Sequence, residues 1–371
     1  MTESGLIIRE VESPADLKAF IRVPWAVYGD DPNWVPPLLA ERRDALSEKN
    51  PFFSHARWKA WIAWRNGEAV GRISAQVDDY HLDQHDPETG FFGLAEGIDD
   101  EKVFRALFQA AEDWLREQGM KRVVGPFNLN INQEIGLLIE GFESPPYIMM
   151  GHARPYHGDF IADLGYRKAK DVLAYEIEQV KFSLPDNIRR LLDRLSGTLS
   201  VRQVDRKNKA EELEAMRQVF NDAWSGNWGF LPFSREEFQA VGKELFMIVP
   251  KDYSWIAEVD GEPAAFIVLL PNLNEAIADL NGRLLPFGWL KLLWRLKVRN
   301  PRSGRVPLMG VRKQYQNTRL GPALAFLVIQ ALHEPTGRRG LKWVELSWIL
   351  EDNQAMRNIL EKIGARVSKR Y

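Results

Sequence analysis

Residues 308–324, LMGVRKQYQNTRLGPAL, constrain the fold more than any other stretch, because their character changes twice within a short distance. Leu308–Val311 is a short apolar run, residues 312–319 are polar or basic, and residues 321–332 repeat apolar side chains at helical spacing. This pattern predicts a strand, a tight basic loop and a long helix. Unpaired backbone N–H groups and the helix dipole both attract anions at such a helix start, so the loop is suited to a pyrophosphate.

This stretch resembles the acyl-CoA-binding loop of the GNAT acyltransferases, in which Arg/Gln-x-x-Gly-x-Gly/Ala follows a strand. Gln316 and Gly321 match the first and last positions, whereas Arg319 stands where the family usually has glycine. Residues 343–365 resemble the family's next strand, its Asn-initiated helix and its closing turn. The alternative is an ordinary strand, loop and helix of an α/β domain.

The resemblance implies acyl-CoA as co-substrate. The residues that it implies for acyl-CoA binding are Met309, Gly310, Val311, Gln316, Asn317, Thr318, Arg319, Leu320, Gly321 and Asn353.

Composition excludes several classes of protein. With 371 residues, 45% of them hydrophobic and 27% charged, the chain is expected to form two globular domains. The net charge of −2 gives no reason to expect a nucleic-acid partner. Cysteine is absent and the six histidines show no metal-ligand spacing, so we predict no metal. No signal peptide or apolar run of membrane-spanning length is found, which predicts a cytoplasmic protein, peripheral on the inner membrane if it contacts lipid.

The two halves of the sequence repeat one order of elements. Each half has a β-hairpin, turning at Asn66–Gly67 or at Asp260–Gly261, followed by a helix and a further strand. The elements expected are a strand at 6–11, a helix at 14–28 capped by Ser13, a hairpin at 58–76, a helix from its cap Asp99 to about 118, a strand at 122–124, a hairpin at 253–270, a helix from Pro322 to Gly340 and a strand at 342–346.

We therefore predict an α/β (α+β) fold of two tandem GNAT-like domains, each a mixed, mainly antiparallel sheet flanked by helices. The N-terminal domain, 1–180, lacks the CoA loop, because its matching stretch 91–100 is acidic. The C-terminal domain, 181–371, contains the CoA loop and an amphipathic insertion at 281–307.

Amide formation from a thioester requires a group that takes a proton from the amine and donors that polarise the carbonyl. By analogy with the family, backbone N–H groups of residues 309–311 hold the carbonyl. Glu345, His157 and Glu134 are candidates for the general base, each against the alternative of an ordinary structural residue. In many GNAT proteins a tyrosine of the Asn-initiated helix protonates the leaving thiolate, but the matching residue here is Leu360.

Two further segments suit an acceptor site. In residues 220–238 the aromatic and amide side chains of Asn221, Trp224, Asn227 and Trp228 could wall an apolar acceptor, or could close the end of the domain. Residues 125–160, rich in asparagine and including Asn132, could line a site, or could form a structural plug between the halves.

Between Leu280 and His333 there is no acidic residue, and ten residues are basic. Within this region, residues 286–305 alternate apolar side chains, including tryptophan, with lysine and arginine at helical spacing. Such a segment suits the surface of an anionic membrane. The alternative is a helix that packs into the core and has a solvated basic edge.

Across its whole length the chain resembles a bacterial family of two-domain GNAT-like proteins that includes ceramide synthases. WAVYGDDPNWVPPL, GLLIEGFESPPYIMMGHARPYH and NDAWSGNWGF carry the resemblance. It implies an acyl-CoA-dependent N-acyltransferase that transfers a long acyl chain to a sphingoid base or another lipid-like amine. The alternatives are a soluble N-acetyltransferase of a small amine or peptide, and a non-catalytic acyl-CoA-binding protein.

Overall fold

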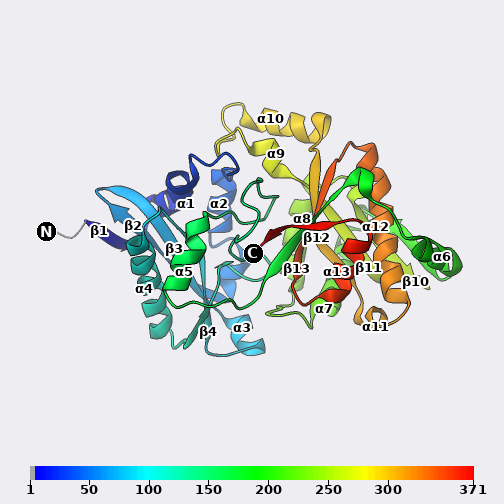
Figure 1. The fold of residues 1–371 in the computed structure, drawn as a ribbon, viewed down its shortest axis with the longest axis horizontal. Helices are drawn as coiled ribbons and strands as arrows, with labels where there is room; N and C mark the ends of the chain where they lie inside the picture. The colour runs from blue at the N-terminus through cyan, green and yellow to red at the C-terminus, as the bar shows by residue number, and fades with distance from the viewer. Residues whose placement is uncertain (1–4) are drawn as a thin grey trace. The chain divides into compact units, whose positions relative to one another are not determined.

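The computed structural model describes residues 5–371, and its internal contacts divide the chain into two compact units (Figure 1). Unit 1 contains the chain up to Asp171, together with Ile277–Trp289 and Lys369–Tyr371. Unit 2 contains Val172–Ala276 and Leu290–Ser368. The contacts therefore divide the chain before the expected boundary at residue 180, and two short later segments belong to unit 1.

Unit 1 is built on a five-stranded sheet with the strand order β1-β2-β3-β4-β5. Its strands are β1 (Leu6–Glu10), β2 (Ala56–Arg65), β3 (Glu68–Asp78), β4 (Thr89–Gly97) and β5 (Arg122–Val124). All neighbours are antiparallel except β4 and β5, which are parallel. The β2–β3 hairpin turns at Asn66–Gly67, as predicted, and both residues have positive φ, which the short asparagine and the side-chain-free glycine tolerate well.

The helices of unit 1 are α1 (Pro14–Tyr28), α2 (Leu39–Ala45), η1 (Pro51–Ser54), α3 (Asp79–Gln84), α4 (Glu101–Glu117) and α5 (Pro155–Asp163), and a small second sheet pairs β6 (Phe127–Asn128) with β7 (Glu134–Ile135). Ser13 caps α1 in a capping box, as predicted. The cap of α4 is Asp100 and not Asp99, because Asp100 is the residue that accepts from the N–H of Lys102. The apolar face of α4 packs on β2 and β3 to form the core.

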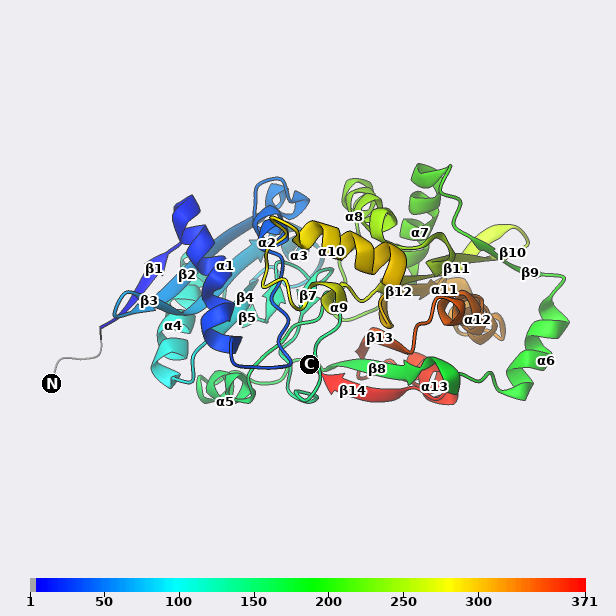
Figure 2. The same cartoon turned by 90° about the horizontal axis from the view of Figure 1, so that it is seen from above.

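Unit 2 is built on a seven-stranded sheet with the order β14-β8-β13-β12-β11-β10-β9. Its strands are β8 (Val172–Glu178), β9 (Leu199–Gln203), β10 (Ser254–Val259), β11 (Glu262–Pro271), β12 (Ser303–Val311), β13 (Trp343–Leu350) and β14 (Arg366–Arg370). Figure 2 shows β8 lying between β13 and β14, although about half of the chain separates it from both in sequence. β12 and β13 are parallel, whereas the pairs β9–β10, β10–β11, β11–β12 and β8–β13 are antiparallel.

The remaining helices are η2 (Gln179–Lys181), α6 (Asp186–Leu195), α7 (Lys209–Trp224), α8 (Arg235–Ile248), η3 (Lys251–Tyr253), α9 (Leu273–Ile277), α10 (Gly288–Trp294), the π-helical turn η4 (Arg295–Arg299), α11 (Lys313–Gln316), α12 (Leu320–Arg338) and α13 (Gln354–Lys362). The hairpin at Asp260–Gly261 and the long helix after the basic loop are confirmed. The expected strand at Leu308 starts earlier, at Ser303, and the basic loop contains the short α11. The expected amphipathic segment is helical only from Gly288 to Arg299.

Candidate active site

The parallel strands β12 and β13 separate partway along their length. They pair from Ser303 with Trp343 to Val306 with Leu346. Beyond this point β12 continues to Val311 paired only with β11, and β13 continues to Leu350 paired only with β8. Between Arg305 and Leu308, β12 has one residue more than β11, which makes Val306–Pro307 a bulge. The separation leaves backbone groups of both strands without a sheet partner on the inner side.

The backbone groups of Met309 and Val311 point into this opening. The N–H of Arg312 donates to the carbonyl of Ala264 on the β11 side, and backbone groups alternate in direction along a strand. Two contacts agree with this alternation: Trp224 Nε1 donates to the Met309 carbonyl at 3.0 Å, and Gln316 Nε2 donates to the Val311 carbonyl at 2.8 Å. The N–H groups of Met309 and Val311 therefore share the inner side, where they could polarise a carbonyl.

The loop between β12 and α12 is held closed by its own side chains. Gln316 Nε2 also donates to the Ala223 carbonyl, and Thr318 Oγ1 accepts from the N–H of Leu320. Gly321 is required at the start of α12, because a Cβ atom there would lie 2.6 Å from the Tyr315 carbonyl oxygen and 2.8 Å from that of Gln316. Arg319 occupies the N-cap position and its side chain caps no N–H group. The start of this helix is therefore electropositive and has no carboxylate in its first turn.

A cavity of about 650 Å³ occupies the opening between β12 and β13. It extends from the loop to the α7–α8 connection and to one face of α13. The predicted binding residues that line it are Met309, Gly310, Val311, Gln316, Asn317, Gly321, Asn353, Trp224, Asn227 and Trp228. The remaining wall is mainly apolar and includes Ile188, Phe326, Leu346, Ile349, Ile359 and Leu360. An apolar cavity of this size with a few polar groups is typical of a small-molecule site.

Glu345 lies behind this cavity and not in its lining. Its side chain is fully buried and pairs with the equally buried Arg305, with 3.6 Å between Nε and Oε1. Ser347 joins the two: its hydroxyl donates to Glu345 Oε1 at 2.7 Å and accepts from Arg305 Nε at 2.8 Å. Arg305 and Glu345 are opposite each other in the β12–β13 register, and Ser347 is two residues further along the same face of β13.

Two known proteins are similar to this chain in sequence over nearly its whole length. The chain is 50% identical over 365 residues to Protein YghO of Escherichia coli, covering 98% of this chain and 94% of that protein. It is 44% identical over 373 residues to the bacterial ceramide synthase of Caulobacter vibrioides, covering 100% and 97%. The chain belongs to the same family as these two proteins. No family model matches the chain.

Two solved structures show the fold. A tandem GNAT protein from the clavulanic acid biosynthesis pathway matches with a TM-score of 0.54 at 12% identity, covering 98% of this chain and 96% of that one. A GCN5-related glucosamine N-acetyltransferase region of a fungal β-N-acetylglucosaminidase matches with a TM-score of 0.60 at 15% identity. The chain spans only 38% of the latter protein's length. The predicted tandem GNAT-like fold is confirmed, and family and fold together identify the chain as an acyltransferase.

The residues of unit 2 that were predicted to bind the acceptor substrate have different roles. Trp224 stacks on Phe220 and binds the Met309 carbonyl, so it fixes one wall of the cavity to β12. Asn227 and Trp228 also line the cavity. Asn221 does not: its amide exchanges two hydrogen bonds with the backbone of Phe233 and closes the α7–α8 connection. Asn353, a predicted cofactor residue, caps α13 through the N–H of Met356.

The other candidates for catalysis lie in unit 1, each within a local contact network. His157 is fully buried, with Nε2 3.2 Å from the Gly97 carbonyl, and burial lowers its pKa to about 4. Glu134 is 3.3 Å from the Arg42 guanidinium and accepts from Asn128. The N–H of Asn132 donates to Asn130. None of these three residues lines the cavity of unit 2, and their predicted roles stay predictions.

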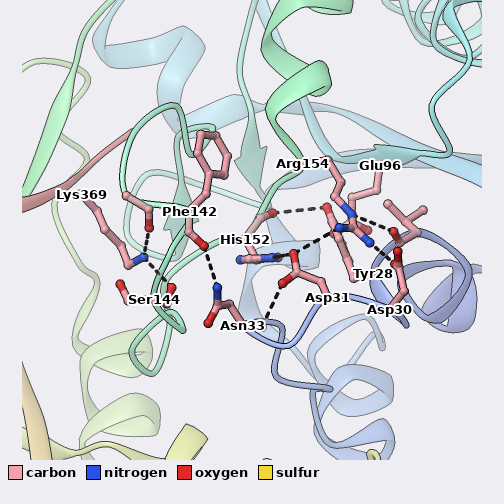
Figure 3. A network of polar contacts seen from close by, with 12 residues as sticks. Tyr28, Asp30, Asp31, Asn33, Glu96, Phe142, Ser144, His152, Arg154 and Lys369 are labelled. Atoms are coloured by element: carbon pink, nitrogen blue, oxygen red, sulfur yellow. Dashed lines mark hydrogen bonds and ion pairs between the residues drawn. The ribbon is translucent and has the colours of Figure 1, made fainter.

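Two segments that carry the family resemblance meet in unit 1 (Figure 3). Asp31 lies 2.9 Å from His152 Nε2 and 3.5 Å from the Arg154 guanidinium. Asn33 donates to the Phe142 carbonyl at 3.0 Å, and Lys369 donates to the Ser144 carbonyl at 2.7 Å. Burial lowers the pKa of His152, which keeps the ring mainly neutral at pH 7. This network ties the loop after α1 to residues 141–154.

Ser347, Trp348, Asp352 and Ile188 line the cavity but were not predicted from the sequence. Alternation along the strand would have placed Ser347 on the same face as Glu345. Ile188 lies on α6, far from the motif in sequence, and no local pattern indicates it.

In residues 5–371 the structure has no helix that is long and apolar enough to cross a membrane. Within the same residues no three His, Cys, Asp or Glu side chains cluster as a metal site would require.

Proposed function

We propose that the protein transfers a long acyl chain from acyl-CoA to the amine of a sphingoid base or another lipid-like amine. The observation that carries this proposal is the cavity of about 650 Å³, which joins an anion-binding loop to an apolar interior. The ceramide synthase relative supports the class of acceptor.

The parts of the cavity suit the parts of acyl-CoA. The pyrophosphate would lie at the start of α12, beside the exposed side chains of Lys313 and Arg319. The thioester carbonyl would accept hydrogen bonds from the N–H groups of Met309 and Val311. The apolar wall formed by Phe326, Leu346 and their neighbours would enclose the acyl chain. An acetyl group would leave most of that wall uncovered.

CoA release by the purified protein tests this proposal. Acetyl-CoA and palmitoyl-CoA are each combined with sphinganine or with a soluble polyamine, in detergent, and freed thiol is measured. Because the chain has no cysteine, a thiol reagent reports only released CoA. Release with palmitoyl-CoA and sphinganine alone supports the proposal. Release with acetyl-CoA and polyamine supports a soluble acetyltransferase, and tight CoA binding without release supports a non-catalytic acyl-CoA-binding protein.

An anionic membrane surface is the partner that we propose for residues 285–299. Half of the large apolar side chains that are exposed in the described chain lie here: Leu285, Phe287, Trp289, Leu290, Leu293, Trp294 and Val298. No side chain of α10 or η4 is buried, which argues against the alternative of a core-packing helix. Lys291, Lys297 and Arg299 lie among them and are exposed. Apolar side chains interleaved with cations suit the headgroup region of a bilayer, where a lipid-like acceptor would be collected.

Vesicle sedimentation tests this partner. The double variant Lys297→Gln, Arg299→Gln is expected to bind phosphatidylglycerol vesicles about 30-fold more weakly, since each cation contributes about 1 kcal/mol near such a surface. Phe287→Ser is expected to weaken binding to the same vesicles. Val180→Ser is the matched control, because Val180 is the most exposed large apolar residue outside this segment. Unchanged binding by the double variant and by Phe287→Ser would contradict membrane docking here.

A further inference from the structure

The cavity contains one hydroxyl group. Among the described residues that line it, Ser347 is the only serine, threonine or tyrosine. The two charged lining residues, Asp352 and Lys362, are both exposed to solvent. Leu360, whose position could have held a proton donor on α13, is apolar and fully buried. A proton that must move inside the apolar part of the cavity therefore has Ser347 as its nearest hydroxyl.

Ser347 also connects the cavity to a buried carboxylate. Its hydroxyl donates to Glu345 Oε1 at 2.7 Å and accepts from Arg305 Nε at 2.8 Å. Glu345 and Arg305 are fully buried, Ser347 is 2% exposed, and neither charged residue lines the cavity. Ser347 therefore offers a proton a direct hydrogen-bonded path between the cavity and Glu345. The Arg305 guanidinium lies 4.5 Å from the centre of the Trp348 ring, which fixes it from the other side.

A contribution to stability does not by itself explain the buried ion pair of Glu345 and Arg305. Burying two opposite charges costs desolvation free energy, and apolar residues of similar volume often stabilise a core equally well. The pair lies where β12 and β13 separate, directly behind the cavity wall. Titratable groups that are buried at such a position are often part of a catalytic site.

We propose that Ser347 is a catalytic hydroxyl and that Glu345 holds a proton for it. The proposal rests on the proposed acyl transfer. When the neutral amine attacks the thioester carbonyl, a C–N bond forms and the nitrogen becomes acidic. Its proton passes to Ser347 Oγ while the Ser347 proton passes to Glu345 Oε1. The C–S bond then breaks and CoA leaves as a thiolate. The proton returns from Glu345 through Ser347 to the thiolate sulfur, giving the amide, CoA thiol and the original carboxylate.

Arg305 is a positioning residue in this scheme. Its positive charge, 3.6 Å from Glu345 Oε1, favours a carboxylate there, and its Nε–H donates to the Ser347 oxygen. The serine hydrogen is thereby directed at Glu345, so that the Ser347 oxygen can take a proton as it gives up its own. The same relay serves as base for the amine and as acid for the thiolate, so a separate donor at Leu360 is not needed.

Ser347→Ala tests the relay under conditions where the wild-type protein turns over. We expect kcat to fall about 100-fold or more, as for the loss of a general acid–base group, while KM and CoA affinity change less than about threefold. Ser347→Thr keeps a hydroxyl on a strand and is expected to retain kcat within about tenfold. The matched control is Ser254→Ala, which removes a fully buried serine from β10 of the same sheet, away from the cavity.

Glu345→Gln supplies a readout that a structural role would not change. The kcat of the wild-type protein is expected to decline toward acid pH as the carboxylate takes up a proton, and this decline should be absent from the residual activity of the variant. Wild-type turnover with unchanged kcat in Ser347→Ala would overturn the relay and leave acyl transfer intact. Loss of activity in a folded, CoA-binding Ser347→Thr equal to that of Ser347→Ala would also overturn it. A wild-type protein without turnover on any donor and acceptor pair would overturn both proposals.

Discussion

The two parallel strand pairs, β4–β5 in unit 1 and β12–β13 in unit 2, lead into helices with opposite charge at their starts. The cap of α4 is Asp100, whose carboxylate accepts from the N–H of Lys102, and Glu101 lies in its first turn. The cap of α12 is Arg319, which caps nothing, and the first turn of α12 contains no acid. Unit 1 therefore supplies an anion from its own sequence, whereas unit 2 can bind one from outside.

The two strand pairs also differ in what lies between them. The bulge of β4, at Leu94–Ala95, is covered by the chain after β5: Asn128 Oδ1 accepts from the Leu94 N–H at 2.8 Å. Gln76 donates to the carbonyls of Phe127 and Leu129 and so holds this segment in place. The bulge of β12, at Val306–Pro307, lines the cavity instead. In unit 1 the chain itself therefore fills the opening, whereas in unit 2 the same opening remains a cavity.

Gly93→Ala should break the filled opening of unit 1. A Cβ atom at Gly93 would lie 1.9 Å from the Phe127 carbonyl oxygen and 2.7 Å from its carbon, so the backbone must move. We expect the free energy of unfolding of unit 1 to fall by about 3 kcal/mol or more. Hydrogen exchange read by mass spectrometry checks this, because it resolves peptides of the two units.

Gly197→Ala is the control for Gly93→Ala, since nothing lies within 4 Å of a Cβ atom there. Equal protection of residues 89–97 and 125–129 in the Gly93→Ala variant and the wild-type protein would show that the opening is not held by this contact.

Acid should weaken unit 1 before unit 2. Of the six histidines, only His333 lies in unit 2. Burial lowers the pKa of His157 from 6.5 to about 4, with smaller contributions from the positive charges of His152 and Arg154. Between pH 4 and pH 6.5, His157 therefore binds a proton in the unfolded chain but not in folded unit 1. The stability from this residue is therefore complete above pH 6.5 and is lost as pH falls toward 4, by about 3 kcal/mol.

Hydrogen exchange between pH 7 and pH 4, corrected for intrinsic rates, measures this difference between the units. His157→Gln removes the titrating group, so the stability gap between variant and wild type should shrink as the pH falls. A gap that stays constant over this range would contradict the assignment to His157.

Gly321→Ala should damage the opening of unit 2, where we propose that acyl-CoA binds. The new Cβ atom meets two backbone carbonyls of the loop, so α12 and the loop must separate. We expect CoA affinity to fall about 30-fold, or about 2 kcal/mol, in titration calorimetry. Gly337→Ala on the same helix is the control, because its nearest neighbour at 3.1 Å is the flexible end of the Gln179 side chain. Equal affinities of the two variants would mean that the loop does not bind CoA.

Sequence reasoning succeeded where the signal is local. The hairpin turns at Asn66–Gly67 and Asp260–Gly261 need residues that accept positive φ. Asparagine, aspartate and glycine accept it, so the turns can be recognised from the residue types alone. The Ser13 cap and the Gly321 helix start are equally local. The early start of β12 was missed because its first residues include Arg305, a charged side chain that becomes buried only through Glu345, forty positions later in the chain.

The site residues show the same difference between local and distant signals. Residues of the motif, such as Gln316 and Gly321, line the cavity because the loop positions them itself. The sequence predicts Glu345 as a candidate general base, and its contacts with Arg305 and Ser347 show that it lies behind Ser347. The place of β8 in the sheet of unit 2, and the filling of unit 1 by Asn128, depend on contacts between distant segments that no local pattern encodes.

Arg319→Asp should make the start of α12 resemble that of α4. The new carboxylate would cap the helix and favour its dipole, raising the stability of unit 2 by about 0.5–1 kcal/mol. The same charge would repel a pyrophosphate, so CoA affinity should fall about tenfold, or about 1.4 kcal/mol, and depend less on salt. Arg338→Asp changes the charge equally at the other end of α12, where an acid is unfavourable, and should lower stability with CoA affinity kept within twofold. Calorimetry and thermal melts of both variants separate these outcomes. If the two variants lose CoA affinity equally, net charge and not the start of α12 determines anion binding.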